Sequence, residues 1–329
     1  MDIAENPVHL ELTGPEISVE IKKYPSIKTL FLKMALLSLK RPSTLADDIN
    51  LSRARMVLNN LTLDTEKIQK YKRVCGFTNP GNTIPISYFQ TLFIGLLGKF
   101  VTTPYFPINP MGLIHIGQSF EQKRPITTDE TLVLSCSLHG VTKTQKGITS
   151  QFLLEVISDK KTIWKGISSF FTRSKIKRSK KKISKEKETF LTILETIFVP
   201  RDMGRQYAGV SNDYNPHHLH WLTARIFGFK QPIAHGMWSL ARVIASLESD
   251  CESQYPRGVN AEFKLPIFMP ATITLGYEKQ KPETSKTQTS KTQDSKPPTD
   301  KNKTHENQIN FELRDESKGV PHLKGQFYF

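Results

Sequence analysis

Three groups that could move a proton or bind a negatively charged oxygen stand close together in the second half of this chain of 329 residues. Asp213 and His218 flank Asn215, and Gly236 follows a short distance further on. A carboxylate and an imidazole can exchange protons with water. A glycine N–H can bind an oxygen because no side chain blocks the approach. Together these groups predict a site that adds water to a polarised carbonyl compound, or removes it.

A plain turn is the alternative interpretation of the same residues. Asp, Asn and Pro are the residues most often found in turns, and a histidine near them is often structural. Residue types alone therefore do not decide between a turn and a site. The longer string from Tyr207 to Met237 carries more information, YAGVSNDYNPHHLHWLTARIFGFKQPIAHGM.

This string resembles the signature of the MaoC-like (R)-specific enoyl-thioester hydratases, a family that also includes 3-hydroxyacyl-thioester dehydratases. The signature has a Tyr, then S-G-D-x-N-P-I-H-x-D, then an Ala, then G-F-x-x-P-I-x-H-G-M. The residues at matching positions are Tyr207, Ser211, Asp213, Asn215, Pro216, His218, Ala224, Gly228, Phe229, Pro232, Ile233, His235, Gly236 and Met237. The resemblance covers about residues 200–275 and is specific in length and spacing.

The resemblance implies a hydro-lyase that reversibly hydrates trans-2-enoyl thioesters to (R)-3-hydroxyacyl thioesters in fatty-acid metabolism. It implies that Asp213 and His218 hold one water between them, and that the Gly236 N–H receives the thioester carbonyl oxygen. The substrate would be carried by coenzyme A or by acyl carrier protein. The reaction implied needs no cofactor.

Four further residues of the string are expected to support this site. Asn215 either orders the loop through its amide or takes part directly, and the sequence leaves both roles open. His235 is expected to be a structural hydrogen-bonding residue in the turn before a helix. Ser211 and Tyr207 complete the supporting set.

The chain departs from the family pattern at four positions. Asn212 replaces the usual Gly, His217 an aliphatic residue, His220 an Asp, and Ile244 a Ser of the following helix. The H-H-L-H run could indicate a metal, but Cys or carboxylate ligands at zinc spacing are missing nearby. We therefore expect no metal.

Composition and charge limit the remaining function classes. The three cysteines include no C-x-x-C pair, and no basic N-terminal stretch leads into an apolar run, so we expect a cytoplasmic protein without a membrane span. The net charge of +15 suits substrates with anionic phosphates, as coenzyme A and acyl carrier protein have. Basic runs without interleaved aromatic residues argue against a nucleic-acid partner.

Four pairs of segments repeat in the same order along the chain. They are 85–90 with 232–237, 122–126 with 263–267, 131–136 with 272–277, and 164–171 with 323–329. Each pair is weak alone, but the shared order indicates two copies of one domain.

Each copy is expected to have an apolar helix followed by strands. Apolar density predicts helices at 85–100 and 237–247, strands at 152–158 and 165–171, and a turn at 139–147. A central helix wrapped by an antiparallel sheet is the hot-dog fold, which the resemblance also implies. The predicted class is α+β, a tandem (double) hot dog.

The predicted boundaries follow from this repeat. Residues 1–173 form an N-terminal degenerate hot-dog domain, 174–188 a basic flexible linker, and 189–329 the C-terminal catalytic domain. A polar, flexible insertion is expected at about 278–308. The first copy has Tyr88-Phe89 in place of His-Gly and is expected to lack catalysis. The chain would act as a monomeric pseudo-dimer or as a homodimer.

Two other function classes remain open from the sequence. The departures from the pattern favour a non-catalytic acyl-thioester-binding module, and the fold also suits a thioesterase. The D-x-N-P-x-H spacing favours the hydratase over the thioesterase. Hydration would remove the conjugated thioester absorbance without releasing thiol, hydrolysis would release thiol, and a binding module would do neither.

Overall fold

The computed structural model of the chain describes residues 7–46, 49, 51–79, 81–174, 192–250, 256–279, 308–317 and 319–329. Its strands are β1 (Val8–Leu10), β2 (Glu16–Glu20), β3 (Arg53–Leu61), β4 (Leu113–Gln122), β5 (Leu132–Thr144), β6 (Gly147–Ser158), β7 (Lys161–Arg173), β8 (Thr192–Val199), β9 (Gly258–Phe263), β10 (Ala271–Lys279), β11 (Gln308–Asp315) and β12 (Pro321–Tyr328). Its helices are α1 (Ile27–Ser38), α2 (Thr65–Cys75), α3 (Tyr88–Leu92), α4 (Ile94–Val101), α5 (Met203–Ser211), α6 (Trp221–Ile226) and α7 (Gly236–Asp250), with short 3₁₀ turns η1 (Pro110–Gly112) and η2 (Pro216–His218).

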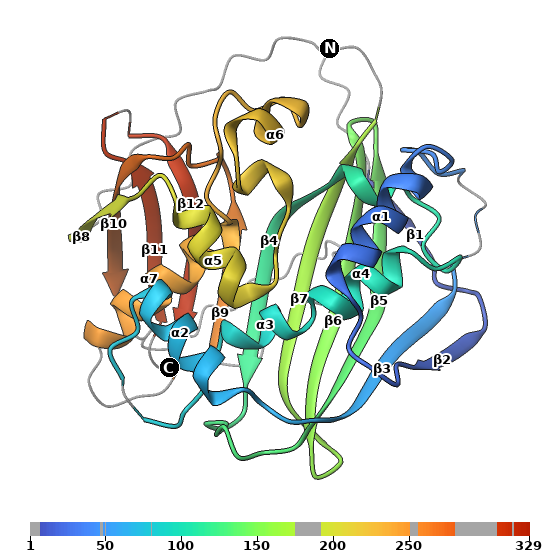
Figure 1. Ribbon diagram of the computed structural model, residues 1–329, viewed down its shortest axis with the longest axis horizontal. Coiled ribbons are helices and arrows are strands. Elements are labelled where there is room, and N and C mark those ends of the chain that lie inside the picture. The colour runs from blue at the N-terminus through green and yellow to red at the C-terminus, as the bar shows by residue number, and fades with distance from the viewer. Residues whose placement is uncertain are drawn as a thin grey trace, which may run out of the picture.

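The strands form one curved sheet whose order is nearly a palindrome. The order is β2-β3-β5-β6-β7-β4-β9-β12-β11-β10-β8, and β1 pairs with β5. The β3-β5-β6-β7-β4 half is followed by its counterpart in reverse, and the two halves join through antiparallel pairing of β4 with β9. Figure 1 shows the helices lying across this sheet.

The repeated sequence segments lie on corresponding elements of the two halves. The pair 131–136 and 272–277 falls on β5 and β10, and the pair 164–171 and 323–329 on β7 and β12. The pair 85–90 and 232–237 leads into α3 and α7. The fold is therefore α+β, a double hot dog, as the sequence predicts. The exact domain boundaries stay a prediction.

The predicted single helix over 85–100 is wrong, because the structure has two helices, α3 and α4, separated at Phe93. The Gly95 N–H donates to the Tyr24 hydroxyl at 3.0 Å. A Cβ at Gly95 would lie 2.7 Å from the Tyr24 ring, so only glycine allows this approach. A side chain inserted into the helical hydrogen-bond ladder is a known cause of a helix break. The predicted helix over 237–247 is confirmed within α7.

The predicted strands over 152–158 and 165–171 are confirmed within β6 and β7. The turn predicted at 139–147 is much shorter, because β5 continues to Thr144 and pairs there with Gly147. The sequence analysis assigned no element to 8–61, where the structure has α1 and three strands.

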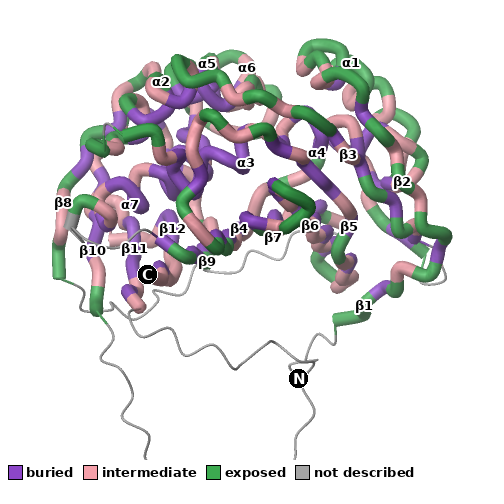
Figure 2. Tube along the Cα trace, turned by 90° about the horizontal axis from the view of Figure 1, so that it is seen from below, coloured by how far each residue is buried: buried purple, intermediate pink, exposed green. Residues whose placement is uncertain are grey.

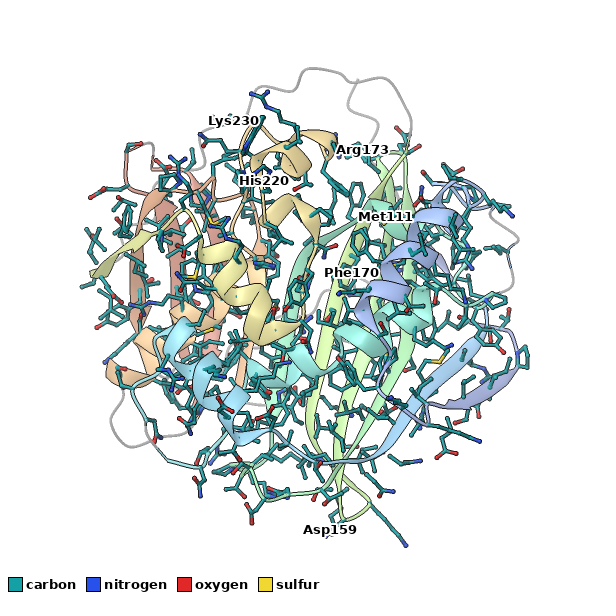
Figure 3. The ribbon with its side chains drawn as sticks, viewed as in Figure 1. Met111, Asp159, Phe170, Arg173, His220 and Lys230 are labelled. Atoms are coloured by element: carbon teal, nitrogen blue, oxygen red, sulfur yellow. The ribbon has the colours of Figure 1, made fainter. Side chains whose placement is uncertain are left out.

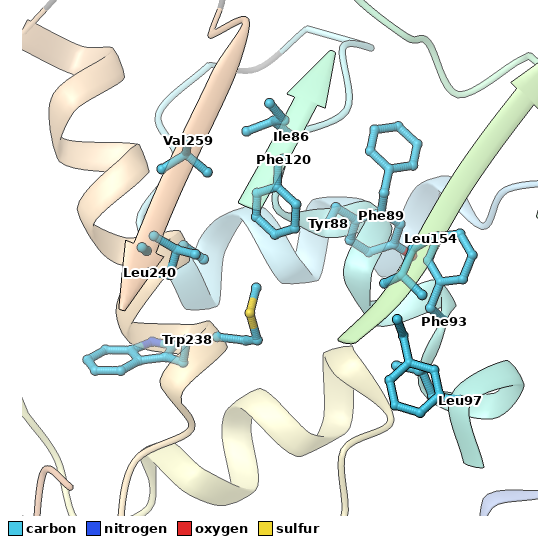
Figure 4. Close-up of a cluster of buried hydrophobic side chains, with 14 of the residues drawn as sticks. Ile86, Tyr88, Phe89, Phe93, Leu97, Phe120, Leu154, Trp238, Leu240 and Val259 are labelled. Atoms are coloured by element: carbon cyan, nitrogen blue, oxygen red, sulfur yellow. The ribbon is translucent and has the colours of Figure 1, made fainter. Parts of the chain in front are cut away.

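The hydrophobic core runs between the helices and the sheet, where Figure 2 shows the buried segments. Figure 4 shows one part of it, with Trp238 and Leu240 of α7 on one side of Phe120 and Phe89 and Phe93 of the first half on the other. Phe120 on β4 and Val259 on β9 are register partners at the junction. The two halves thus share one core, so neither half can move far without disturbing the other.

Two predicted polar segments lie almost wholly outside the described residues. These are the basic linker at 174–188, of which only Ser174 is described, and the insertion at about 278–308, whose ends belong to β10 and β11. Among the described residues, no helix combines the length and apolar character needed to cross a membrane.

Candidate active site

The loop that carries Asp213 begins where α5 ends in a left-handed residue. Asn212 has a φ of 63°, a region that Asn tolerates better than most residues. Its side-chain oxygen accepts a hydrogen bond from Lys67 Nζ of α2 at 2.8 Å. The family's usual glycine is thus replaced by an asparagine that the first half of the chain holds in place.

Local hydrogen bonds fix the Asp213 carboxylate. The Asp213 N–H donates to the Ser211 hydroxyl at 3.1 Å. Asp213 Oδ1 accepts from the Asn215 backbone N–H at 3.2 Å and from the Asn215 side-chain amide at 2.6 Å. Oδ2 makes neither of these bonds, so it is the oxygen that can hold a water or a substrate. These contacts favour the first of the two roles predicted for Asn215, ordering the loop, and its role stays a prediction.

His218 is buried and its tautomer follows from one contact. Its Nδ1 lies 2.8 Å from the Ile233 carbonyl oxygen, which can only accept, so Nδ1 carries the hydrogen. Burial lowers the pKa of His218 well below its usual value, with smaller contributions from His235 and His217, while Asp213 acts in the opposite direction. The ring is therefore neutral at pH 7, and Nε2 is left with a lone pair, as a general base requires.

His235 contacts the main chain of the same loop. Its Nε2 donates to the Asp213 carbonyl oxygen at 2.9 Å and lies 4.0 Å from Asp213 Oδ2. Burial lowers the pKa of His235 to about 3, so this ring is also neutral. The His235 and His218 rings stack with centroids 3.6 Å apart. His235 thus contacts both Asp213 and His218.

The structure brings these three side chains together. Ligand atoms of Asp213, His218 and His235 all lie within 4.8 Å of one another. His218 Nδ1 and His235 Nε2 already donate to carbonyl oxygens, so a cation could use only the other nitrogen of each ring. The prediction of a site without metal stays a prediction.

Gly236 starts α7 directly after His235. The N–H groups of the first helical turn have no partner within the helix, and the helix dipole adds positive potential there. A Cβ at Gly236 would lie 2.9 Å from the ring of Phe263 on β9. Glycine therefore lets the Phe263 ring pack closely against the start of α7, where a larger residue would clash.

Tyr207 lies against the His235 ring, with centroids 4.9 Å apart. Its hydroxyl is buried, and no hydrogen-bond partner for it is found in the described part of the chain. Burial, followed by Cys75 and Asp213, raises the pKa of Tyr207 well above its usual value, so the hydroxyl keeps its proton. With Tyr207, all seven residues that the sequence predicts for the site have been located, and they lie on the segment from α5 to the start of α7.

The other departures from the family pattern have local explanations. His220 is the N-cap of α6, and its Nδ1 accepts from the Leu222 N–H at 3.2 Å, which is the hydrogen bond that an Asp would make. His217 packs near Phe227 and Phe229. Ile244 belongs to the fully buried core.

Two residues near the site were missed by the sequence analysis. A Cβ at Gly204 of α5 would overlap the His218 carbonyl group, so this glycine lets the histidine segment pack close to α5. His115, on β4 of the first half, lies within the electrostatic influence of Asp213. Neither belongs to a motif, and only the fold brings them to the site.

Comparisons with known proteins show which proteins this chain resembles. Residues 175–302 match the MaoC-like domain family. The 3-hydroxyacyl-thioester dehydratase X of Mycobacterium tuberculosis is 26% identical over 224 residues, which are 67% of this chain and 78% of that protein.

Solved structures show the same fold. The crystal structure of HtdX from Mycobacterium tuberculosis has a TM-score of 0.64 at 22% identity and covers 83% of this chain and 98% of its own. A MaoC-like dehydratase from Phytophthora capsici has a TM-score of 0.62 at 16% identity and covers 85% and 96%. Residues 175–302 are therefore similar to the MaoC-like domain family, the chain has the double hot-dog fold, and its sequence is similar to that of 3-hydroxyacyl-thioester dehydratase X.

Proposed function

We propose that this protein is a hydro-lyase that reversibly hydrates trans-2-enoyl thioesters to (R)-3-hydroxyacyl thioesters. One observation carries the proposal. A neutral His218 with a free Nε2, the Asp213 carboxylate and the N-terminus of α7 at Gly236 are gathered on one segment. The MaoC-like match and the named dehydratase relative support the same reaction class.

In the hydration direction, a water donates one hydrogen bond to Asp213 Oδ2 and one to His218 Nε2. His218 takes a proton as the water oxygen forms a bond to C3 of the substrate. The π electrons of the C2–C3 double bond move towards the thioester oxygen. His218 then returns the proton to C2, so one O–H bond is broken and one C–O and one C–H bond are formed.

The negative charge that develops on the thioester oxygen needs a fixed donor. The Gly236 N–H is proposed to supply it, helped by the positive end of α7. Asn215 and His235 hold Asp213 in place from its side chain and its main chain. With Asp213 held in this way, its Oδ2 atom faces the water of the proposed reaction.

The substrate of the proposed reaction is carried by coenzyme A or by acyl carrier protein. Their phosphates suit the net charge of +15. Among the described residues, the cysteines Cys75 and Cys136 are free and buried, which suits the cytoplasmic location that we propose.

The test follows the conjugated thioester absorbance of a short 2-enoyl-CoA, with a thiol reagent in a parallel reaction. We expect the absorbance to fall without release of thiol, and a 3-hydroxyacyl-CoA of (R) configuration to form. Release of thiol would indicate a thioesterase instead. Binding without either change would indicate the non-catalytic module.

A further inference from the structure

His115 lies at an irregularity in β4, on the first half of the chain. In the pairing of β4 with β7, His115 faces Phe170 and Gly117 faces Ser169, so Ile116 is left without a partner. A β-bulge of this kind changes the direction of the side chains beside it, and bulges are frequent next to active sites. Figure 3 labels Phe170, the residue opposite His115.

His115 packs between two phenylalanine rings, and one of them connects it to the proposed site. Its ring stacks on Phe170 with centroids 4.7 Å apart and lies 4.8 Å from the ring of Phe263. Phe263 is the same side chain that occupies the space beside the Gly236 Cα. The pairing of β4 with β9, which begins at Gly117 and Glu262, produces this contact. The first half therefore contributes a histidine that packs on Phe263, the side chain next to the start of α7.

The Nε2 atom of His115 is buried and has no hydrogen-bond partner among the residues that the structure describes. Two hydroxyls around Phe170 share this property, Ser150 Oγ on the opposing strand β6 and Thr172 Oγ1 on β7 itself. A buried polar atom without a partner costs free energy, and such atoms gather where a ligand can satisfy them. No reaction step proposed above uses any of the three.

The chemistry of His115 restricts the group that it can bind. Burial lowers its pKa to about 4, while Asp213, the Gly117 backbone and the Gln118 side chain act in the opposite direction. The ring is therefore neutral at pH 7. A neutral ring suits a neutral polar group better than a phosphate, and it can donate or accept according to its tautomer.

We propose that His115 contacts the substrate and that its Nε2 hydrogen-bonds the amide nearest to the sulfur in the thioester arm. This amide is two carbons from the sulfur in both coenzyme A and acyl carrier protein thioesters, on the side opposite the reacting carbonyl. An amide has both an N–H and a C=O, so either tautomer of His115 can bind it. The inference rests on the proposed hydratase function, because that function places a thioester at Gly236.

The experiment compares two short substrates in three proteins. The 2-butenoyl thioester of N-acetylcysteamine has this amide, and the S-pentyl thioester is similar in length but lacks it. The His115→Phe variant keeps the aromatic packing and removes the nitrogen, whereas His115→Gln keeps a neutral hydrogen-bonding group. His139→Gln, at an exposed position on β5, is the matched control.

The wild-type protein is expected to prefer the amide substrate by about fivefold in kcat/KM, mainly through KM. His115→Phe should lose this preference with little change in kcat, His115→Gln should keep part of it, and the control should keep all of it. A preference that is unchanged in His115→Phe would overturn the inference. So would an equal loss for both substrates with unchanged thermal stability, because that would be a packing effect.

A binding measurement separates this inference from the proposed function. The saturated butanoyl thioesters of the same two arms cannot be hydrated, and calorimetry gives their affinities. If the wild-type protein hydrates neither enoyl substrate, the proposed function fails. The inference then stands only if the amide-bearing butanoyl thioester binds more tightly to the wild type than to His115→Phe, and it fails if the two affinities are equal.

Discussion

The two halves of the chain contain the same loop with different chemistry. Residues 71–80 read YKRVCGFTNP and residues 207–216 read YAGVSNDYNP, with Tyr, Val, Asn and Pro in common. Both α2 and α5 end in a left-handed residue, Gly76 and Asn212. Phe77 then occupies the position of Asp213, and its ring stacks on Tyr71 instead of facing a site. The two helices therefore end in the same way, and the first half lacks the carboxylate because Phe77 stands in place of an Asp.

The same comparison applies to the carbonyl group before each helix. The Ile233 oxygen accepts from His218 Nδ1, and the corresponding Ile86 oxygen accepts from Trp164 Nε1 at 3.0 Å. An indole has one N–H and no further nitrogen, whereas an imidazole has a second nitrogen for chemistry. A side-chain N–H thus satisfies the corresponding carbonyl in each half, but at this position the second half has the imidazole that we propose as the base. We infer that the first half can lack the site because its packing needs only an N–H donor to this carbonyl oxygen.

The largest effect is expected from the two groups that the first half lacks. Asp213→Asn or His218→Gln should each lower kcat by about a hundredfold or more, because each removes a contact to the same water. The double variant should be little worse than either single variant. Steady-state kinetics with a 2-enoyl-CoA measures this, with His139→Gln as the control. Losses that multiply in the double variant would contradict a shared water.

Gly236 is the second difference, since Phe89 occupies the matching position in the first half. Gly236→Ala should lower kcat/KM by about tenfold or more, because the added methyl would meet the Phe263 ring beside the proposed oxyanion donor. Gly209→Ala on α5 is the matched control, since no atom lies within 4 Å of a Cβ there. Thermal unfolding of both variants separates loss of activity from loss of fold. Full activity in Gly236→Ala would remove this residue from the site.

The pH dependence tests whether the histidines around the site are neutral. His218 faces Asp213, His217 and His235, and burial holds its pKa below 6.5, so kcat/KM should stay level as the pH falls through 6.5 and decline only at lower pH. A decline centred near pH 6.5 would show that the base is exposed to solvent.

Stability should change in the range where activity does not. His235 and His115 have pKa values lowered to about 3 and about 4, so the unfolded chain binds more protons than the folded one below pH 6.5. Each such histidine then costs about 2 kcal/mol of stability at pH 5, and the urea midpoint should fall between pH 7 and 5. A midpoint that rises over this range would contradict buried neutral rings.

A smaller effect is expected where α2 of the first half meets α7 of the second. Burial raises the pKa of Glu248 to about 8, and Lys72 acts in the opposite direction. A carboxyl with a raised folded pKa loses stability as the pH rises from 4.5 towards 8, so Glu248→Gln should stabilise the protein by about 1–2 kcal/mol at pH 8 and little at pH 5. Urea unfolding at both pH values measures this. Equal effects at the two values would contradict a buried carboxyl.

The sequence predicts the part of the candidate site that is formed by residues close together along the chain. Asp213, Asn215 and His218 lie within one short loop, so their spacing alone indicates how they meet. The repeat likewise predicted which strands correspond, because hydrophobic patterns follow the elements that bury them.

Features that depend on distant contacts could not be predicted. The break between α3 and α4 follows from the Tyr24 hydroxyl, which is 71 residues away from Gly95. His115 reaches the site only through the pairing of β4 with β9, and it stands in no motif. The hairpin of β5 and β6 extends further than its polar sequence indicates because the two strands pair up to Thr144 and Gly147.

The central claim is that the chain has one catalytic site, in its second half. Calorimetric titration of the protein with a slowly hydrated enoyl-CoA analogue counts the binding sites per chain directly. We predict one equivalent per chain, and no residual hydration in the Asp213→Asn, His218→Gln double variant beyond the low rate of the single variants. Two equivalent sites per chain, or near wild-type hydration in the double variant, would contradict the account.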